Sequence, residues 1–235
     1  MRRARWLFIA FAMAGCAHAP STLPADALLQ QAIDAAGGEA ALSQAQVLAW
    51  TGEAVVVADG QRIELGVDTS VEPFTQARSD TWLRDRGRST LRSLEIDGNQ
   101  GWMTRGEQRT AMPIAMQRHE RAQYAVYGLM RLVTLRDAGA NVQALPDDVD
   151  GLHGLRVSHP HAPTAELYFH GDGRLAYLTN SVPAPDGDGS VAQRFDFEGT
   201  IEADGVRWPR TLRISQSGQP YFELHLLTFH ATPNQ

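Results

Sequence analysis

The sequence predicts a mainly β (α+β) fold in which one wide, strongly curved antiparallel sheet carries helices on its concave face. From residue 47 onwards apolar and polar residues alternate with a period of two, and Gly-containing turn sequences separate the alternating runs. Two helical stretches interrupt this pattern, one before residue 47 and one near the middle of the chain. We expect roughly ten or eleven strands, and an open sheet of that width curls or closes because its strands twist.

The domain is expected to begin with two short helices. Pro24 and Asp26 are typical of a helix start, residues 28–33 supply an apolar stripe, and Gly37-Gly38 ends the helix. A second helix is expected from Glu39 to about Gln44.

Residues 47–112 are expected to form a meander of antiparallel strands. Ile63, Leu65 and Val67 alternate with charged residues, and Asp97-Gly98 is one of several turn sequences between such runs. Further strands of this part are expected at about 74–84, 88–96, 101–105 and 108–112.

Pro113 opens a long helical stretch that we expect to continue to about Asp137. Its second half, residues 124–133, is apolar on nearly every side, and a helix of that kind must be covered by other parts of the protein. The concave face of a curved sheet needs such a cover, so we place the helix there.

A second meander is expected after this helix. Its strands are expected at about 153–159, 164–170, 174–181, 191–202, 206–215 and 220–230. Residues 183–189 form a Pro/Gly/Asp-rich loop, and no internal repeat or linker marks a domain boundary. Residues 25–235 are therefore predicted to form a single domain.

The composition excludes several chemistries. All 21 basic residues are Arg and Cys16 is the only cysteine. Without lysine there is no Schiff base and no P-loop lysine, and one cysteine gives no intrachain disulfide or Cys-rich zinc site. The net charge of −6 disfavours nucleic acid as a partner, because such binding needs a basic surface to displace phosphate counterions.

The N-terminal residues are typical of a lipoprotein signal peptide, which we assign to residues 1–15. Arginines precede an apolar run too short to span a bilayer, and Met13-Ala14-Gly15-Cys16 resembles the bacterial lipobox. This resemblance implies acylation of Cys16, a lipidated tether over residues 16–24 and attachment to a membrane. Ala17 in place of aspartate implies the periplasmic face of the outer membrane. The alternative is an ordinary secretory signal with an incidental cysteine.

The order of elements, from lipobox and tether through helix, meander, central apolar helix and second meander, resembles the LolA/LolB-like lipoprotein-carrier superfamily. The resemblance covers about residues 25–230, with local similarity at Asp97-Gly98-Asn99-Gln100-Gly101-Trp102 and Asp204-Gly205-Val206-Arg207-Trp208-Pro209. It implies an unclosed half-barrel whose concave side is plugged by helices, with acyl chains held in the apolar cavity between. Because Cys16 implies a lipid anchor, the anchored acceptor type is the nearer analogue. No functional residue of the superfamily matches a position here.

Aromatic side chains and one flexible methionine are the candidate lining of such a cavity. The candidates are Trp82, Trp102, Tyr124, Tyr127, Met130, Phe195 and Phe197. The alternative for each is ordinary core packing, since aromatic residues on a sheet face normally pack. The expected function is binding of a lipid or of a lipoprotein's acyl chain, and the alternative is an anchored module with a filled core that binds an envelope protein.

A hydrolase or metal enzyme is a third hypothesis. Residues 153–170 hold four histidines, and His159 and His161 flank a proline, which indicates a turn or an edge strand. Asp186-Gly187-Asp188-Gly189 places Ala184 and Phe195 where a calcium loop needs carboxylates. No Gly-x-Ser-x-Gly or HExxH motif is present. We therefore expect no cofactor, no metal and no catalytic residue.

Overall fold

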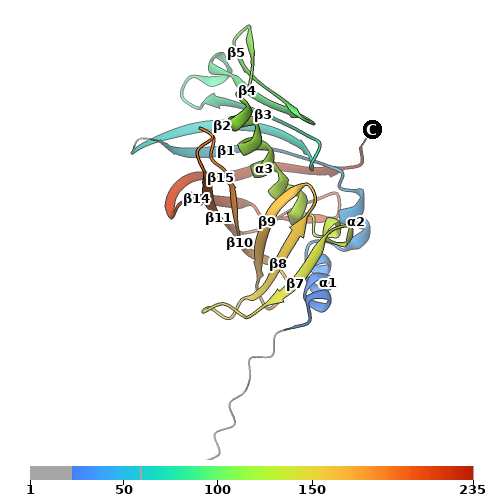
Figure 1. The fold of residues 1–235 in the computed structure, drawn as a ribbon. Helices are drawn as coiled ribbons and strands as arrows, with labels where there is room; N and C mark the ends of the chain where they lie inside the picture. The colour runs from blue at the N-terminus through green and yellow to red at the C-terminus, as the bar shows by residue number, and fades with distance from the viewer. Residues whose placement is uncertain (1–22, 59, 235) are drawn as a thin grey trace, which may run out of the picture.

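The computed structural model describes residues 23–58 and 60–234, so the predicted signal peptide, Cys16 and most of the tether lie outside the described residues. Within them the chain forms one 13-stranded antiparallel sheet, a two-stranded ribbon and three α-helices. The strand order is β6-β5-β4-β3-β2-β1-β15-β14-β11-β10-β9-β8-β7, with β6 and β7 left as free edges. The sheet curves without closing (Figure 1). The predicted half-barrel is therefore confirmed.

Helix α1 covers Ala25–Ala35, α2 covers Glu39–Gln44 and α3 covers Ile114–Met130, with two 3-10 helices at Gly87–Thr90 and Val133–Arg136. Helix α1 buries its apolar stripe, as the sequence predicts, because residues three and four apart share one side of a helix. No helix among the described residues has both the length and the apolar character needed to cross a membrane.

The first meander runs from the centre of the sheet to one edge. Its strands are β1 (Val47–Ala58), β2 (Gln61–Glu72), β3 (Gln76–Leu83), β4 (Arg92–Asp97), β5 (Gln100–Arg105) and β6 (Gln108–Ala111). The strand expected at 88–96 begins only at Arg92. The reason is a tight turn in which the Thr90 hydroxyl donates to the carbonyl of Gly87 and accepts from the amide of Leu83.

The second meander fills the other half of the sheet. Its strands are β7 (Asn141–Leu145), β8 (His153–His159), β9 (Ala162–Phe169), β10 (Leu175–Pro183), β11 (Ser190–Glu198), β14 (Thr211–Gln216) and β15 (Gln219–Thr232), and the ribbon is β12 (Ile201–Ala203) with β13 (Val206–Trp208). The long strands predicted at 191–202 and 206–215 are each interrupted. Gly199 has a φ of 63°, and Pro209 has no amide hydrogen for a ladder.

Helix α3 crosses the concave side of the sheet and contacts β4, β9 and β10 (Figure 1). It ends at Met130, earlier than predicted, because Leu132 takes a φ of 61°. The buried Thr134 hydroxyl donates to the carbonyl of Gly128 at 2.7 Å and satisfies one of the last carbonyls of the helix. Gly128 also permits close packing, since a Cβ there would lie 2.3 Å from the Phe74 ring.

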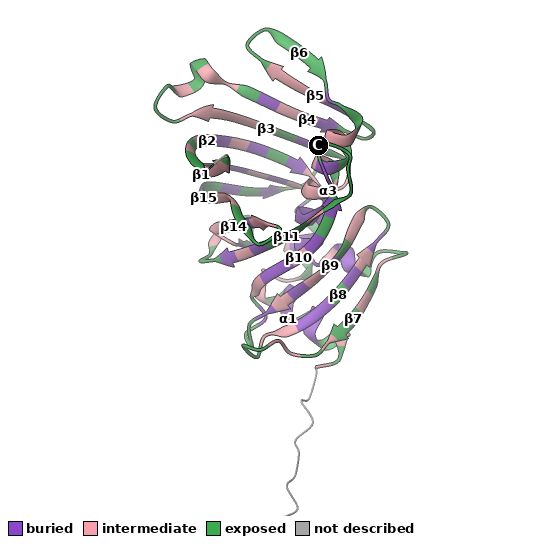
Figure 2. Ribbon diagram, turned by 60° about the vertical axis from the view of Figure 1, so that its left-hand side comes forward, coloured by how far each residue is buried: buried purple, intermediate pink, exposed green. Residues whose placement is uncertain are grey.

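The packed core is concentrated in the half of the sheet that α1, α2 and the C-terminal half of α3 cover. Figure 2 shows buried residues along β8 to β11 and mostly exposed or intermediate ones on β5 and β6. Several large side chains of β8 to β11 are fully buried, including Leu155, Leu167, Phe169, Leu178 and Phe195. The concave face of β2 to β6 is covered less completely.

Candidate functional site

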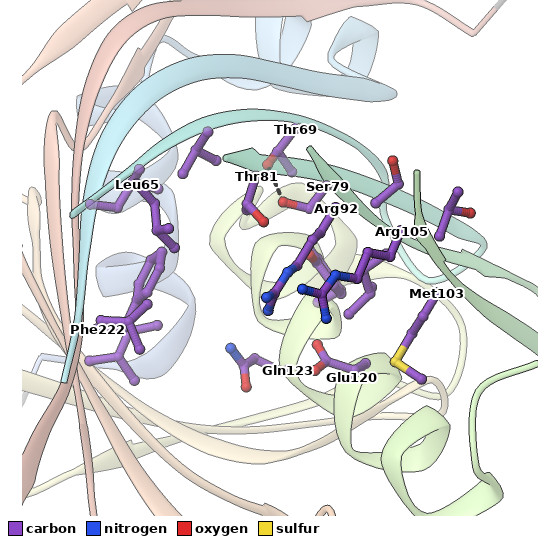
Figure 3. A pocket seen from close by; sticks show the side chains of 18 of the residues that line it. Leu65, Thr69, Ser79, Thr81, Arg92, Met103, Arg105, Glu120, Gln123 and Phe222 are labelled. Atoms are coloured by element: carbon purple, nitrogen blue, oxygen red, sulfur yellow. Dashed lines mark hydrogen bonds between the residues drawn. The ribbon is translucent and has the colours of Figure 1, made fainter. Parts of the chain in front are cut away.

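A cavity of about 560 Å³ lies between α3 and the concave face of strands β1 to β6, next to β14 and β15. Its size is within the range of about 300–1,000 Å³ that is typical of small-molecule sites. Helix α3 contributes Glu120, Gln123, Tyr124 and Tyr127 (Figure 3 labels the first two). These four residues follow the spacing of one helix face, so one side of α3 forms a wall of the cavity.

The strand register decides which sheet residues reach the cavity. Val67 pairs with Thr81, and Leu94 pairs with Met103. All four line the cavity, because directly opposed residues of an antiparallel pair project from the same face. Their sequence neighbours project from the convex face.

One end of the cavity is apolar. Its lining includes Trp50, Val56, Leu65, Val67, Ile214, Phe222 and Leu224. Trp50 and Leu224 are 4% and 2% exposed, and the rings of Trp50 and Tyr127 lie 4.9 Å apart. This end therefore consists of fixed apolar side chains.

The other end is polar and contains charged groups. Figure 3 shows Arg92 and Arg105 extending from the sheet into the cavity, with Glu120 and Gln123 on the helix beyond them. The Gln123 side-chain carbonyl accepts a hydrogen bond from the Gln193 amide at 3.3 Å. Burial raises the pKa of the Glu120 carboxyl, and the nearby His119 opposes this effect.

Burial also raises the pKa of both tyrosines, Tyr124 and Tyr127, and the charge of Glu120 adds to the increase. Both phenols are therefore neutral at physiological pH and act only as hydrogen-bonding groups. The cavity as a whole suits an amphiphilic guest with a hydrocarbon part and a polar part.

Only two of the seven side chains proposed to line the cavity, Tyr124 and Tyr127, do so. Phe195 is fully buried in the packed half of the core. Met130 and Phe197 instead line a separate cavity of about 240 Å³ beside α1. Their positions follow from the close packing of helices against β8 to β11.

The placement of Trp82 and Trp102 is a correction, because both lie on the convex face. Trp82 pairs with Gly66 and its ring occupies the space of the missing side chain, since a Cβ on Gly66 would lie 2.3 Å from it. The guanidinium of Arg88 lies 4.3 Å from the Trp82 ring centre, and that of Arg109 lies 4.4 Å from Trp102. These tryptophans form cation–π contacts outside the cavity.

The histidines that suggested a metal site have other contacts. His159 stacks on Phe74 with the ring centres 4.3 Å apart, and His161 lies 5.5 Å from His159. Across residues 23–58 and 60–234 no group of three or more His, Cys, Asp or Glu side chains is arranged to hold a metal ion. Asp186 accepts a hydrogen bond from the amide of Asp188, as in an ordinary Asx turn.

Sequence reasoning missed the polar end of the cavity, which contains Arg92 and Arg105. The Asp97-Gly98 turn could have predicted that these two arginines lie opposite each other. A two-residue hairpin that pairs Asp97 with Gln100 also sets Arg92 opposite Arg105.

Comparison with known proteins gives the fold. Neither a protein-family model nor a curated protein matches the sequence. A solved LolA superfamily protein from Nitrosomonas europaea has a TM-score of 0.56 and 10% identity, covering 91% of this chain and 95% of its own. A domain assigned to outer-membrane lipoprotein sorting, from Vibrio parahaemolyticus, has a TM-score of 0.54 and 12% identity, covering 87% and 92%.

A third solved structure, a DUF1329 family protein from Desulfovibrio piger, has a TM-score of 0.55 and 10% identity, with 89% of this chain and 94% of that chain covered. At such low identities the likeness concerns the fold alone. The chain therefore has the LolA/LolB-like fold that the order of its sequence elements predicts.

Proposed function

We propose that this protein is a cell-envelope carrier that binds a lipid, or the acyl chain of a lipoprotein, in the cavity between α3 and the sheet. The observation that carries this proposal is the cavity of about 560 Å³ with one apolar end. Transfer of hydrocarbon into such a space is favourable by about 25 cal/mol per Å² of apolar surface removed from water. We assign no catalytic residue and no cofactor to this function.

The LolA/LolB-like fold supports the same function. One structural neighbour is described as an outer-membrane lipoprotein-sorting domain, and another as a LolA superfamily protein. A filled core would instead have favoured the alternative, a module that only binds an envelope protein. The cavity favours the carrier because α3 leaves the concave face of β2 to β5 accessible to a guest.

We further propose that an acylated Cys16 anchors the protein to the periplasmic face of the outer membrane. The eight residues from Cys16 to Pro24 extend over about 26 Å at most, so the domain would lie close to the lipid surface. Two or three acyl chains are needed for stable attachment, since one chain binds a membrane only weakly.

Native mass spectrometry tests the carrier function. The full chain with Cys16→Ser is delipidated, refolded with phospholipid or an acylated peptide, and weighed. We expect one hydrophobic guest to be retained, and a protein that never retains one refutes the function.

A matched pair of variants locates the guest. Thr81→Trp places a large ring in the cavity, whereas Ser70→Trp places the same ring on the exposed convex face of β2. We expect Thr81→Trp to lose the guest and Ser70→Trp to keep it. Equal retention by the two folded variants contradicts binding in this cavity.

A further inference from the structure

Arg92 and Arg105 lie directly opposite each other on β4 and β5, at the exposed mouth of the cavity. Figure 3 shows that both side chains extend into the cavity rather than away from it. Like charges at directly opposed strand positions repel each other and destabilise a sheet. An anion between the two guanidinium groups would remove this repulsion.

Nearby arginines on the convex face have carboxylate partners. Glu95 accepts from Arg78 at 2.5 Å and from Arg109 at 2.7 Å, and Asp68 lies 3.1 Å from Arg88. Within the part of the chain that the structure describes, Arg92 and Arg105 form no ion pair and no side-chain hydrogen bond. Their charges are therefore available to a ligand.

Glu120 is the carboxylate that lines the same cavity, and it does not neutralise the two arginines. It lies more than 4.0 Å from both, since no ion pair joins them in the described structure. Burial raises the pKa of Glu120, which favours its neutral form. The polar end of the cavity thus carries a net positive charge.

The charged residues lie at the exposed mouth of the cavity, and the apolar lining lies at its buried end. Arg92, Arg105 and Gln108 are exposed, whereas Trp50 and Leu224 at the other end are buried. Hydrocarbon is favoured at the buried end, and an anionic group is favoured at the mouth, where guanidinium groups bind carboxylate or phosphate through paired hydrogen bonds.

We propose that Arg92 and Arg105 form an anion site that selects amphiphiles with a carboxylate or phosphate group, whose hydrocarbon part occupies the cavity. This inference rests on the proposed carrier function and adds the chemical class of the guest. Neutral and cationic amphiphiles of the same chain length are excluded as preferred guests, because neither offsets the charge of the two arginines.

Calorimetric titration with ligands that differ only in head group tests the selection. The full chain with Cys16→Ser is titrated with palmitate, hexadecyl phosphate, hexadecanol and hexadecyltrimethylammonium, each below its micellar concentration. We expect both anions to bind at least about tenfold more tightly than hexadecanol, as is typical for charge-assisted hydrogen bonds. The cation is expected to bind most weakly.

The outcomes separate this inference from the carrier function. Equal affinity for palmitate and hexadecanol overturns the anion site and leaves the carrier function intact. Failure of all four amphiphiles to bind overturns both. Inorganic phosphate alone is a further probe, and its binding as tightly as hexadecyl phosphate would overturn the placement of hydrocarbon in the cavity.

Variants assign the selectivity to the two arginines. In Arg92→Gln/Arg105→Gln we expect palmitate affinity to fall about tenfold and hexadecanol affinity to stay the same, which also shows that the cavity is still folded. Arg62→Gln is the matched control, since Arg62 is exposed on the convex face of β2 and has no ion pair in the described structure. An equal loss of palmitate affinity in Arg62→Gln would overturn the assignment.

Discussion

The turn between α1 and α2 allows the packing of this fold to be tested at two adjacent glycines. Gly37 has a φ of 122° and Gly38 a φ of 90°, a region that residues with a Cβ rarely adopt. A Cβ on Gly37 would lie 2.2 Å from the carbonyl oxygen of Gly205, whereas a Cβ on Gly38 meets nothing within 4 Å. The two positions therefore share backbone strain and differ in the clash.

The expected magnitudes follow from that difference. Gly38 has a ψ of 161°, and alanine in this essentially glycine-only region costs about 1–3 kcal/mol, a cost that we apply to Gly37→Ala and Gly38→Ala alike. The clash at Gly37 involves backbone, so no side-chain rotation relieves it, and overpacking adds about 1–3 kcal/mol. We expect Gly37→Ala to lose about 2–6 kcal/mol of unfolding free energy and Gly38→Ala about 1–3 kcal/mol.

Urea unfolding followed by circular dichroism measures both values in the Cys16→Ser full chain. The backbone amide of Arg207 donates to the carbonyl of Ala36 at 2.9 Å, so a shift of this turn also weakens the contact between α1 and the β12–β13 ribbon. If Gly37→Ala and Gly38→Ala are equally destabilised, close backbone contact does not require Gly37.

Three further predictions concern the cavity, the end of α3 and the anchor. Because Glu120 has a raised pKa, its contribution to stability is full below the unfolded pKa of about 4.5 and is lost as pH rises through the folded pKa, so Glu120→Gln should be more stable than the unsubstituted protein at pH 8 and equal to it near pH 4. Urea midpoints at both pH values check this, and a less stable variant at pH 8 contradicts it. Thr134→Val should cost about 0.5–1.5 kcal/mol in the same assay, because it removes the shorter of the two hydrogen bonds to the Gly128 carbonyl and leaves the one from the Arg131 amide at 3.3 Å; no measurable loss argues against this role. Cys16→Ser should abolish incorporation of labelled palmitate, whereas a variant that still incorporates the label rules out an acyl anchor at Cys16.

Strand positions were predicted well where turns are marked by glycine. Asp97-Gly98 and Arg105-Gly106 end β4 and β5 as expected, because glycine adopts the positive φ that these turns need. Strand β7 was missed, since it is a short and mostly exposed edge strand of five residues.

The residues that line the cavity were harder to predict, because the lining depends on which face of the sheet each side chain projects from. Trp82 and Trp102 were placed in the cavity by residue type, although their register with Gly66 and Glu95 puts them on the convex face. A shift of one residue in register moves every side chain of a strand to the other face of the sheet. The register therefore decides which residues line the cavity, whatever their residue type. Tyr124 and Tyr127 do line the cavity, because helix α3 lies on the concave face of the sheet (Figure 1).

The pairing of β1 with β15 has a consequence for how the chain folds. Thr51 and Thr228, which share a hydrogen bond across these strands, are 177 residues apart in sequence. Each meander is local, but the junction between them closes one very long loop, and such contacts slow folding. While the chain is synthesised from its N-terminus, the edge of β1 in the first meander stays unpaired until β15 is available. An unpaired edge recruits other strands, so we expect chaperone dependence and aggregation to be greatest in this interval.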